Sequence, residues 1–232
     1  MQNPPVLLQR TAERETFAGV TYHIDGELVP VLTLTVTPDR PVYFEHNIML
    51  WKEPSVGIGI RRMKGALKRM VAGMQVFVTE TQGQGEIAFS RDGAGHIFGI
   101  HLGAGQEIHV REHQFLAATG AVDYDFQRVK GVASMLFGGT GFFIDKFHAP
   151  QGDGILWLHG YGNVFEKVLA QGEVIDVEPG GWLYKDASVQ MTTNLQSLST
   201  GLFGSMNFVT NRFTGPGKIG IQSMYMHYVT ES

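Results

Sequence analysis

The stretch VLAQGEVIDVEPGGWLYKDASV (168–189) decides the fold, because the chain carries related versions of it. HLGAGQEIHVREHQFLAATGAV (101–122) has the same order of apolar residues and turn glycines, 67 residues earlier. A more distant version spans residues 27–48, at a constant offset of 141 residues. The matched apolar positions are, in order, Leu169, Ile175, Val177, Trp182, Leu183 and Val189; Leu102, Ile108, Val110, Phe115, Leu116 and Val122; and Leu28, Leu34, Val36, Val42, Tyr43 and Ile48. Self-similarity of this period predicts a fold built from repeated units.

The residues before these stretches repeat as well. Phe77, Gly85, Ile87 and Phe89 match Phe143, Gly154, Leu156 and Leu158, and the C-terminal part of the chain starts another copy with Phe208, Gly217, Ile219 and Ile221. We therefore expect one domain, 1–232, with repeat A at 63–124, repeat B at 129–191, and repeat C formed by 196–229 plus 16–50. If the two pieces of repeat C are neighbours in space, the chain closes a ring of pseudo-threefold symmetry.

Within each copy the apolar residues alternate with polar ones over short runs. Glycine- and proline-containing turns separate these runs, for example QGQG (82–85), RDGAG (91–95) and EPGG (178–181). Period-two alternation between such turns is typical of short antiparallel strands. The sequence predicts an all-β protein.

Composition excludes several classes of function. The chain of 232 residues is 43% hydrophobic and 17% charged, with a net charge of −4, so we expect a soluble protein that binds no nucleic acid. It has no cysteine, which excludes disulfides, thiol catalysis and cysteine-ligated zinc. Its first residues resemble neither a secretory signal nor a mitochondrial presequence, and no apolar run is long enough to span a membrane. We expect a cytoplasmic protein.

One segment in each copy departs from the β pattern. These segments are RRMKGALKRMVAGMQVF (61–77), QRVKGVASMLFGGTGFF (127–143) and TNLQSLSTGLFGSMNF (193–208), and the first could form one or two helical turns. We call residues 61–76, 127–142 and 195–207 the crown segments, since threefold symmetry places them at one end of the molecule.

Two interpretations of the crown segments remain open. They plug the open ends of the sheets, or they form an exposed, methionine-rich surface that meets a membrane surface or a protein partner. The residues proposed for such a surface are Met63, Met70, Met74, Met135, Leu136, Phe137, Leu202, Phe203 and Met206.

Three motifs carry a family resemblance: NRFTGPGKIGIQS (211–223), DKFHAPQGDGILWLH (145–159) and the opening stretch 168–189. Together they resemble the family named for altered inheritance of mitochondria, over about Phe17 to Tyr228. The resemblance implies three repeats like the tryptophan RNA-binding attenuation protein, each a short double-stranded β-helix, in pseudo-threefold arrangement. It implies no known enzymatic activity, catalytic residue or cofactor. The association of mitochondrial members with inner-membrane organisation implies a scaffold or a membrane-adjacent role.

Histidines are the strongest candidates for enzymatic chemistry. His109-Val110-Arg111-Glu112-His113 fits the H-x-x-E-H zinc pattern, which requires a helix. The matching residues in the other copies, DVEPG (176–180) and TVTPD (35–39), indicate a strand that enters a turn, so we expect no zinc protease site. A cupin-like metal enzyme with an asymmetric site remains the alternative, although the chain has no H-x-H pair. Its candidate ligands are His96, His101, His148, His159 and His227.

The FTGPG motif (213–217) also has two interpretations. Its backbone amides could bind an anion beside Arg212 and Lys218, or Pro216 and Gly217 could form a tight turn between strands. The turn is favoured, because the related copies keep turn residues and lose the other details. The sequence thus favours a non-enzymatic scaffold or binding protein with no catalytic residue, metal or cofactor, and with homo-oligomerisation possible.

Overall fold

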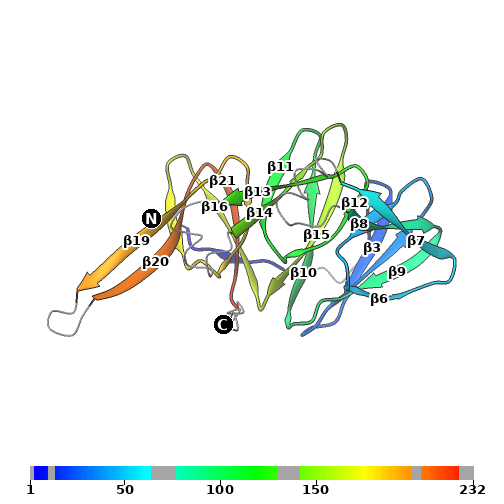
Figure 1. The fold of residues 1–232 in the computed structure, drawn as a ribbon, viewed down its shortest axis with the longest axis horizontal. Helices are drawn as coiled ribbons and strands as arrows, with labels where there is room; N and C mark the ends of the chain where they lie inside the picture. The colour runs from blue at the N-terminus through cyan, green and yellow to red at the C-terminus, as the bar shows by residue number, and fades with distance from the viewer. Residues whose placement is uncertain (1–2, 10–13, 64–76, 130–141, 200–204, 225–232) are drawn as a thin grey trace.

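The computed structural model describes residues 3–9, 14–63, 77–129, 142–199 and 205–224 (Figure 1). The regular structure of these residues consists of antiparallel strands in four sheets, without a helix. The prediction of an all-β protein is confirmed.

Three N-terminal strands come first: β1 (Val6–Leu7), β2 (Glu15–Phe17) and β3 (Val20–Asp25). The remaining strands fall into three successive sets of six, which we call units. The first unit contains β4 (Val31–Val36), β5 (Val42–Phe44), β6 (Met49–Lys52), β7 (Val56–Arg62), β8 (Phe77–Gly83) and β9 (Gly85–Phe89). The second unit contains β10 (Gly95–Leu102), β11 (Glu107–Arg111), β12 (Phe115–Thr119), β13 (Asp123–Val129), β14 (Phe142–His148) and β15 (Gly154–Tyr161). The third unit contains β16 (Val164–Leu169), β17 (Val174–Val177), β18 (Trp182–Asp186), β19 (Gln190–Ser199), β20 (Ser205–Thr214) and β21 (Gly217–Gln222).

Each unit contains the same two groups of three paired strands. The last strand of the unit pairs with its first and third strands, which gives β4–β9–β6, β10–β15–β12 and β16–β21–β18. The fifth strand pairs with the second and fourth, which gives β5–β8–β7, β11–β14–β13 and β17–β20–β19. The strand pairing therefore recurs three times along the chain.

A register shift marks equivalent positions in the third strand of every unit. It falls between Met49 and Trp51 in β6, between Phe115 and Ala117 in β12, and between Trp182 and Tyr184 in β18. A bulge of this kind bends a strand locally and fixes its register. Leu50, Leu116 and Leu183 consequently occupy the same position in the three units.

Neighbouring units are joined edge to edge. Strand β12 of the second unit pairs with β5 of the first, and β18 of the third unit pairs with β11 of the second. These joints produce a six-stranded sheet and a seven-stranded sheet, the latter extended by β1. Figure 1 shows the units in a row, with β3, β6 and β9 to the right and β19 and β20 at the left end.

The described strands pair differently from the arrangement predicted for repeat C. Strands β20 and β21 pair with β16, β17, β18 and β19, and with no described strand of residues 16–50. Val42 pairs with Thr119 in the same way as Ile108 pairs with Asp186, so Val42 is structurally equivalent to Ile108. The sequence comparison matches Val42 with Phe115 instead, so the first unit is displaced from the predicted register. The difference in register has a physical cause, because strand side chains alternate with period two and a shift by an even number of residues preserves the apolar pattern.

Three hydrophobic clusters form the core, and the first two are completed by the following unit. The first cluster includes Leu116, Ala117 and Trp157 from the second unit, and the second cluster includes Leu183 and Tyr184 from the third. The third cluster consists of Ile144, Leu169, Val177, Trp182, Val189, Phe213 and Ile219, packed with Ile175, Met191 and Ile221. Apart from Ile144, these residues come from the third unit itself.

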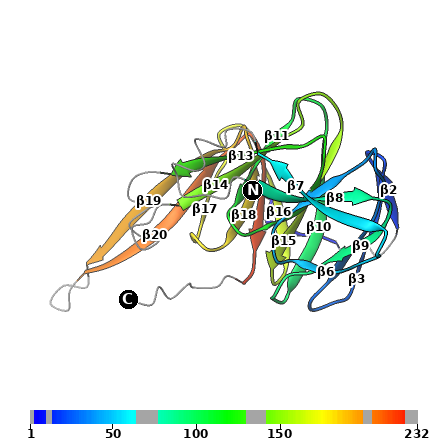
Figure 2. The same ribbon diagram turned by 45° about the vertical axis from the view of Figure 1, so that its right-hand side comes forward.

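The crown segments connect the two strands of equivalent hairpins, β7–β8, β13–β14 and β19–β20. In Figures 1 and 2 the arrowheads of β7, β13 and β19 point toward the same end of the row. Residues 64–76, 130–141 and 200–204 lie outside the described residues, and so do the helical turns predicted for the first segment.

Candidate functional site

A cleft of about 550 Å³ lies where the second unit meets the third. The strands β10 and β11 contribute one side, and β16, β18 and β21 the other. Its apolar lining is Leu8, Phe98, Ile100, Leu102 and Ile108, and its polar lining includes His101, Gln106, Glu107, Glu166, Tyr184, Asp186, Ser188 and Lys218. A concave site with an apolar floor and a few polar groups is typical of small-molecule binding.

Carboxylates hold the polar side of this cleft in place. The Tyr184 hydroxyl donates to Glu166 Oε2 at 2.6 Å, and Lys218 Nζ lies 3.3 Å from Glu166 Oε1. The backbone N–H of Lys218 donates to Asp186 Oδ2 at 2.8 Å. Burial, followed by the charge of Glu166, raises the pKa of Tyr184 well above its usual range. Tyr184 is therefore a neutral donor at physiological pH, suited to hydrogen bonding rather than to proton abstraction.

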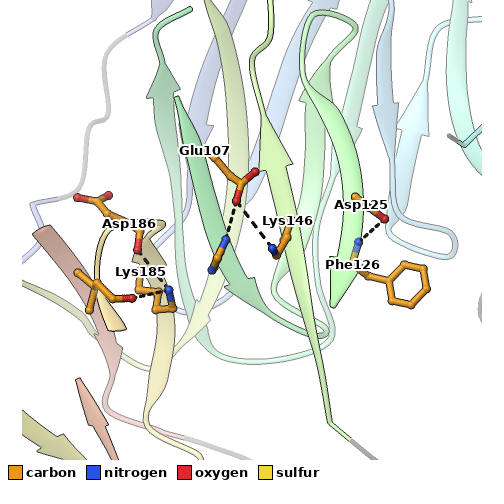
Figure 3. Close-up of polar contacts among 8 residues, drawn as sticks. Glu107, Asp125, Phe126, Lys146, Lys185 and Asp186 are labelled. Carbon is orange, nitrogen blue, oxygen red and sulfur yellow. Dashed lines mark hydrogen bonds and ion pairs between the residues drawn. The ribbon is translucent and has the colours of Figure 1, made fainter. Parts of the chain in front are cut away.

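A second polar group lies beside the cleft and shares Glu107 with it (Figure 3). His109 Nε2 lies 2.7 Å from Glu107 Oε1, and Lys146 Nζ lies 4.0 Å from the same oxygen. Burial lowers the pKa of His109, and the hydrogen bond to the Glu107 carboxylate opposes this effect. His109 is therefore held largely neutral at pH 7.

Lys185 is the most perturbed cation of this group. Its ammonium donates to the Val189 carbonyl at 2.7 Å and to the Asp186 carbonyl at 3.3 Å. Burial, together with the charge of Lys146, lowers the pKa of Lys185 to about 8. Such a lysine can act as a base or a nucleophile when it faces a substrate. Here it is buried against backbone carbonyls and does not line the cleft, so its contacts are those of a structural cation.

His159 is buried at the junction of the first and second units. Neither of its ring nitrogens has a hydrogen-bond partner within the described residues. Burial, followed by the charge of Arg91, lowers the pKa of His159 to about 4. Arg91 itself pairs with Glu45 and donates to the Phe115 carbonyl at 2.7 Å. The imidazole is therefore neutral above about pH 5.

The histidines named from the sequence do not converge. Across the described ranges, no three His, Asp or Glu side chains are grouped closely enough to hold a metal ion. His101 stacks on Phe17 with ring centroids 3.8 Å apart, and His159 packs edge-on against Tyr161. His227 lies outside the described residues.

The two remaining motifs adopt the conformations expected from the repeat. His109 lies on β11 and His113 lies in the following turn with φ +67°, so the H-x-x-E-H match is on a strand and a turn. The FTGPG motif forms the turn between β20 and β21. The cations beside this turn already contact carboxylates, since Arg212 donates two hydrogen bonds to Asp176 and Lys218 Nζ lies 3.3 Å from Glu166 Oε1.

The crown residues have different outcomes. Met63 is 8% exposed, so its side chain packs inside the protein. Met206 lies on β20. The other proposed residues lie outside the described part of the chain: Met70, Met74, Met135, Leu136, Phe137, Leu202 and Phe203. The cleft was missed by sequence reasoning, because its residues come from strands of two different units.

Residues 22–224 match the family described as Mitochondrial biogenesis AIM24. The chain belongs to this family. None of the curated proteins compared with this AIM24 chain matches it. Among solved structures, the chain is similar to protein SPYM3_0169 from Streptococcus pyogenes, with a TM-score of 0.65 and 20% sequence identity. That similarity covers 89% of this chain and 94% of the streptococcal chain, and at this identity it shows a shared fold.

A further structural question is whether any helix could span a membrane. No helix within the described residues is long and apolar enough to cross a bilayer. The name of the AIM24 family refers to mitochondria, so the cytoplasmic location expected from the sequence stays a prediction.

Proposed function

We propose that this protein is a non-enzymatic scaffold that binds a membrane surface through its crown segments. The observation that carries the proposal is the equivalence of the hairpins β7–β8, β13–β14 and β19–β20, each of which connects through one segment that contains methionine and other apolar residues. Three similar binding segments on one rigid chain multiply the strength of weak individual contacts.

The composition of the first crown segment supports a membrane surface over a protein partner. Residues 61–76 combine Arg62, Lys64, Lys68 and Arg69 with methionine, leucine and valine, while Arg61 already pairs with Glu80. Basic residues attract anionic lipid headgroups, and apolar residues enter the boundary of the acyl chains. An anionic bilayer is the surface that this chemistry fits.

Two finer descriptions belong to the same proposal. Each unit is a repeat like the tryptophan RNA-binding attenuation protein, in the form of a short double-stranded β-helix. The scaffold needs no metal or cofactor for its function. Elemental analysis of purified protein checks the second statement, since stoichiometric iron, manganese, nickel or zinc would favour a metal-dependent enzyme instead.

Vesicle binding tests the proposal directly. Met70, Leu136 and Phe203 are replaced together by serine, and flotation is measured with vesicles of phosphatidylcholine alone and with added phosphatidylglycerol. The intact protein should float with the anionic vesicles, and the triple variant should bind at least about tenfold more weakly. A matched control replaces the exposed Leu28, which lies between β3 and β4, with serine. Equal flotation of the folded triple variant and the wild type would overturn the proposal.

The cleft favours a second candidate function, the binding of a small polar ligand. Glu107, Glu166 and Asp186 outnumber Lys218 among its charged groups, so the cleft suits a cation with an apolar part. Thermal-shift measurements with spermidine and with choline test this candidate. Stabilisation that is lost in Glu166→Gln would support it, and no shift at millimolar ligand would contradict it.

A further inference from the structure

The two ends of the row each leave one strand edge without the partner that its equivalents have. Strand β6 has one paired neighbour, β9, and β17 has one, β20, within the described residues. Their counterparts β12 and β18, and β5 and β11, each have a second neighbour across a joint between units. The fourth strands β7, β13 and β19 are sheet edges in all three units. None of them therefore lacks a neighbour that its equivalents have.

The side chains of β6 are exposed where their equivalents are buried. Leu50 is 58% exposed, whereas Leu116 and Leu183 are fully buried in the core of the preceding unit. Met49 and Trp51 on either side of Leu50 are also among the exposed large apolar residues. An exposed apolar strand edge is a risk of aggregation unless another strand covers it.

At the opposite end of the row, the third unit lacks the contacts that a following unit makes at the two joints. Among the residues that the structure describes, the first and second hydrophobic clusters each include a leucine from the next unit, whereas the third cluster includes no leucine from another unit. Val174 on the free edge of β17 is itself exposed. In the described part of the chain, the third unit therefore has a strand edge without a second paired strand and a core without a leucine from another unit. Strand β6 and Leu50 would supply both.

We propose that the chain associates head to tail with further copies of itself, β6 of one copy pairing antiparallel with β17 of the next. The sheet halves β4–β9–β6 and β17–β20–β19 then form one sheet, as the corresponding halves already do at the two joints within the chain. Leu50 of the copy that supplies β6 then fills the third cluster of the copy that supplies β17. Addition of a strand to an open sheet edge supplies backbone hydrogen bonds, and the side chains set the specificity.

The register of the new joint follows from the existing ones. In the β11–β18 joint His109 lies opposite Lys185 and Val110 opposite Tyr184. The equivalent residues place Asp176 of one copy opposite Lys52 of the other, and Val177 opposite Trp51. An opposite-charge pair and a pair of an aromatic with a β-branched side chain are both stabilising across two strands. The charges on the two edges are thus complementary.

A second copy is the occupant that the structure favours, because Figure 1 separates the two edges within one chain. The sheet of β19 and β20 lies at the left end of the row and β6 lies in its right-hand part, so one chain does not join its own edges. Because the two surfaces differ, the contact is heterologous, and repeated contacts produce a closed ring or an open filament.

Sedimentation of the full chain tests the proposal. Wild-type protein should form species larger than the 25.6 kDa monomer in a concentration-dependent manner. Leu50→Lys should raise the dissociation constant by about tenfold or more, since it places a charge in the joint. The matched control is Leu28→Lys, at an exposed leucine in the turn between β3 and β4, which should assemble like wild type. A wild type that remains monomeric at about 200 µM, or a folded Leu50→Lys that assembles unchanged, would overturn the proposal.

A charge exchange tests the partner and the register. Lys52→Glu and Asp176→Lys should each assemble more weakly than wild type, and an equimolar mixture of the two should recover assembly, because the exchanged charges then face each other across the joint. Circular dichroism checks that both variants are folded. Recovery in the mixture identifies a second copy as the occupant. A mixture that assembles as weakly as the separate variants contradicts the proposed register. Binding of an unrelated peptide to the open edges of the unassembled protein would contradict self-association.

Discussion

The inner joints and the outer ends of the row use the same strands with opposite results. At the joints, β12 and β18 pair on both sides, and Leu116 and Leu183 are buried in the neighbouring unit. At the end of the row, β6 pairs on one side and Leu50 is exposed. The comparison shows that the third strand of a unit is buried only when another unit precedes it. The reason is that each unit leaves part of its core to be filled by the third strand of the next unit.

The largest expected effect comes from shortening the equivalent leucines. Leu116→Ala and Leu183→Ala should each lower the free energy of unfolding by about 2–5 kcal/mol, because both leave a cavity in a packed core. Leu50→Ala should change it by less than about 0.5 kcal/mol in dilute, unassembled protein. Urea unfolding of the three variants measures this contrast. Equal losses at all three positions would break the distinction between joints and ends.

The inner joint between the first two units should also respond to acid. The pKa of His159 is about 4 in the folded protein and about 6.5 in the unfolded chain, so the unfolded state binds more protons between these values. Stability should therefore fall as the pH drops from about 6.5 to 4, by about 3 kcal/mol from this group.

The measurement is thermal unfolding of wild type and His159→Gln across that pH range. The variant has no group that titrates at this position, so its stability should depend less steeply on pH. Parallel profiles for the two proteins would show that the buried imidazole contributes nothing to acid sensitivity.

A smaller effect is expected at the joint between the second and third units. The lowered pKa of Lys185, about 8 compared with 10.5, means that the folded state loses its proton first. Stability from this group should rise between about pH 8 and 10.5, by an amount on the order of 1 kcal/mol after allowance for screening by solvent. Lys185→Met should remove this rise when urea unfolding is compared at about pH 7.5 and pH 10. A variant that retains the full rise would assign it to other groups.

A small effect on stability is also expected for the ion pair at the outer end of the third unit. Asp176 binds Arg212 in a partly exposed pair, so Asp176→Asn should cost less than about 1 kcal/mol in unfolding experiments. The same variant should weaken assembly at low salt, since it removes the charge that faces Lys52 of a second copy. A stability loss comparable with that of Leu183→Ala would mean that this end is as tightly integrated as the joints.

The candidate site was less accessible to sequence reasoning than the strands were. The turn at FTGPG and the strand-to-turn position of His109 follow from local glycine, proline and alternation patterns, and both are observed. The cleft depends on Tyr184 and Glu166 meeting Glu107 across a joint between units. Nothing in the local spacing of these residues indicates that they meet, and the burial of His159 depends equally on packing between strands distant in the chain.

By itself the sequence determined that this protein is all-β, because alternation of apolar residues and the placement of turn glycines are local properties of strands. Only the tertiary structure decided which strands are neighbours. Shifting a strand by an even number of residues leaves its apolar face unchanged, so the pattern could not choose between a third copy closed by the two termini and three successive copies in a row. The choice was made by pairing and core filling between units, which left β6 and β17 as the two open edges.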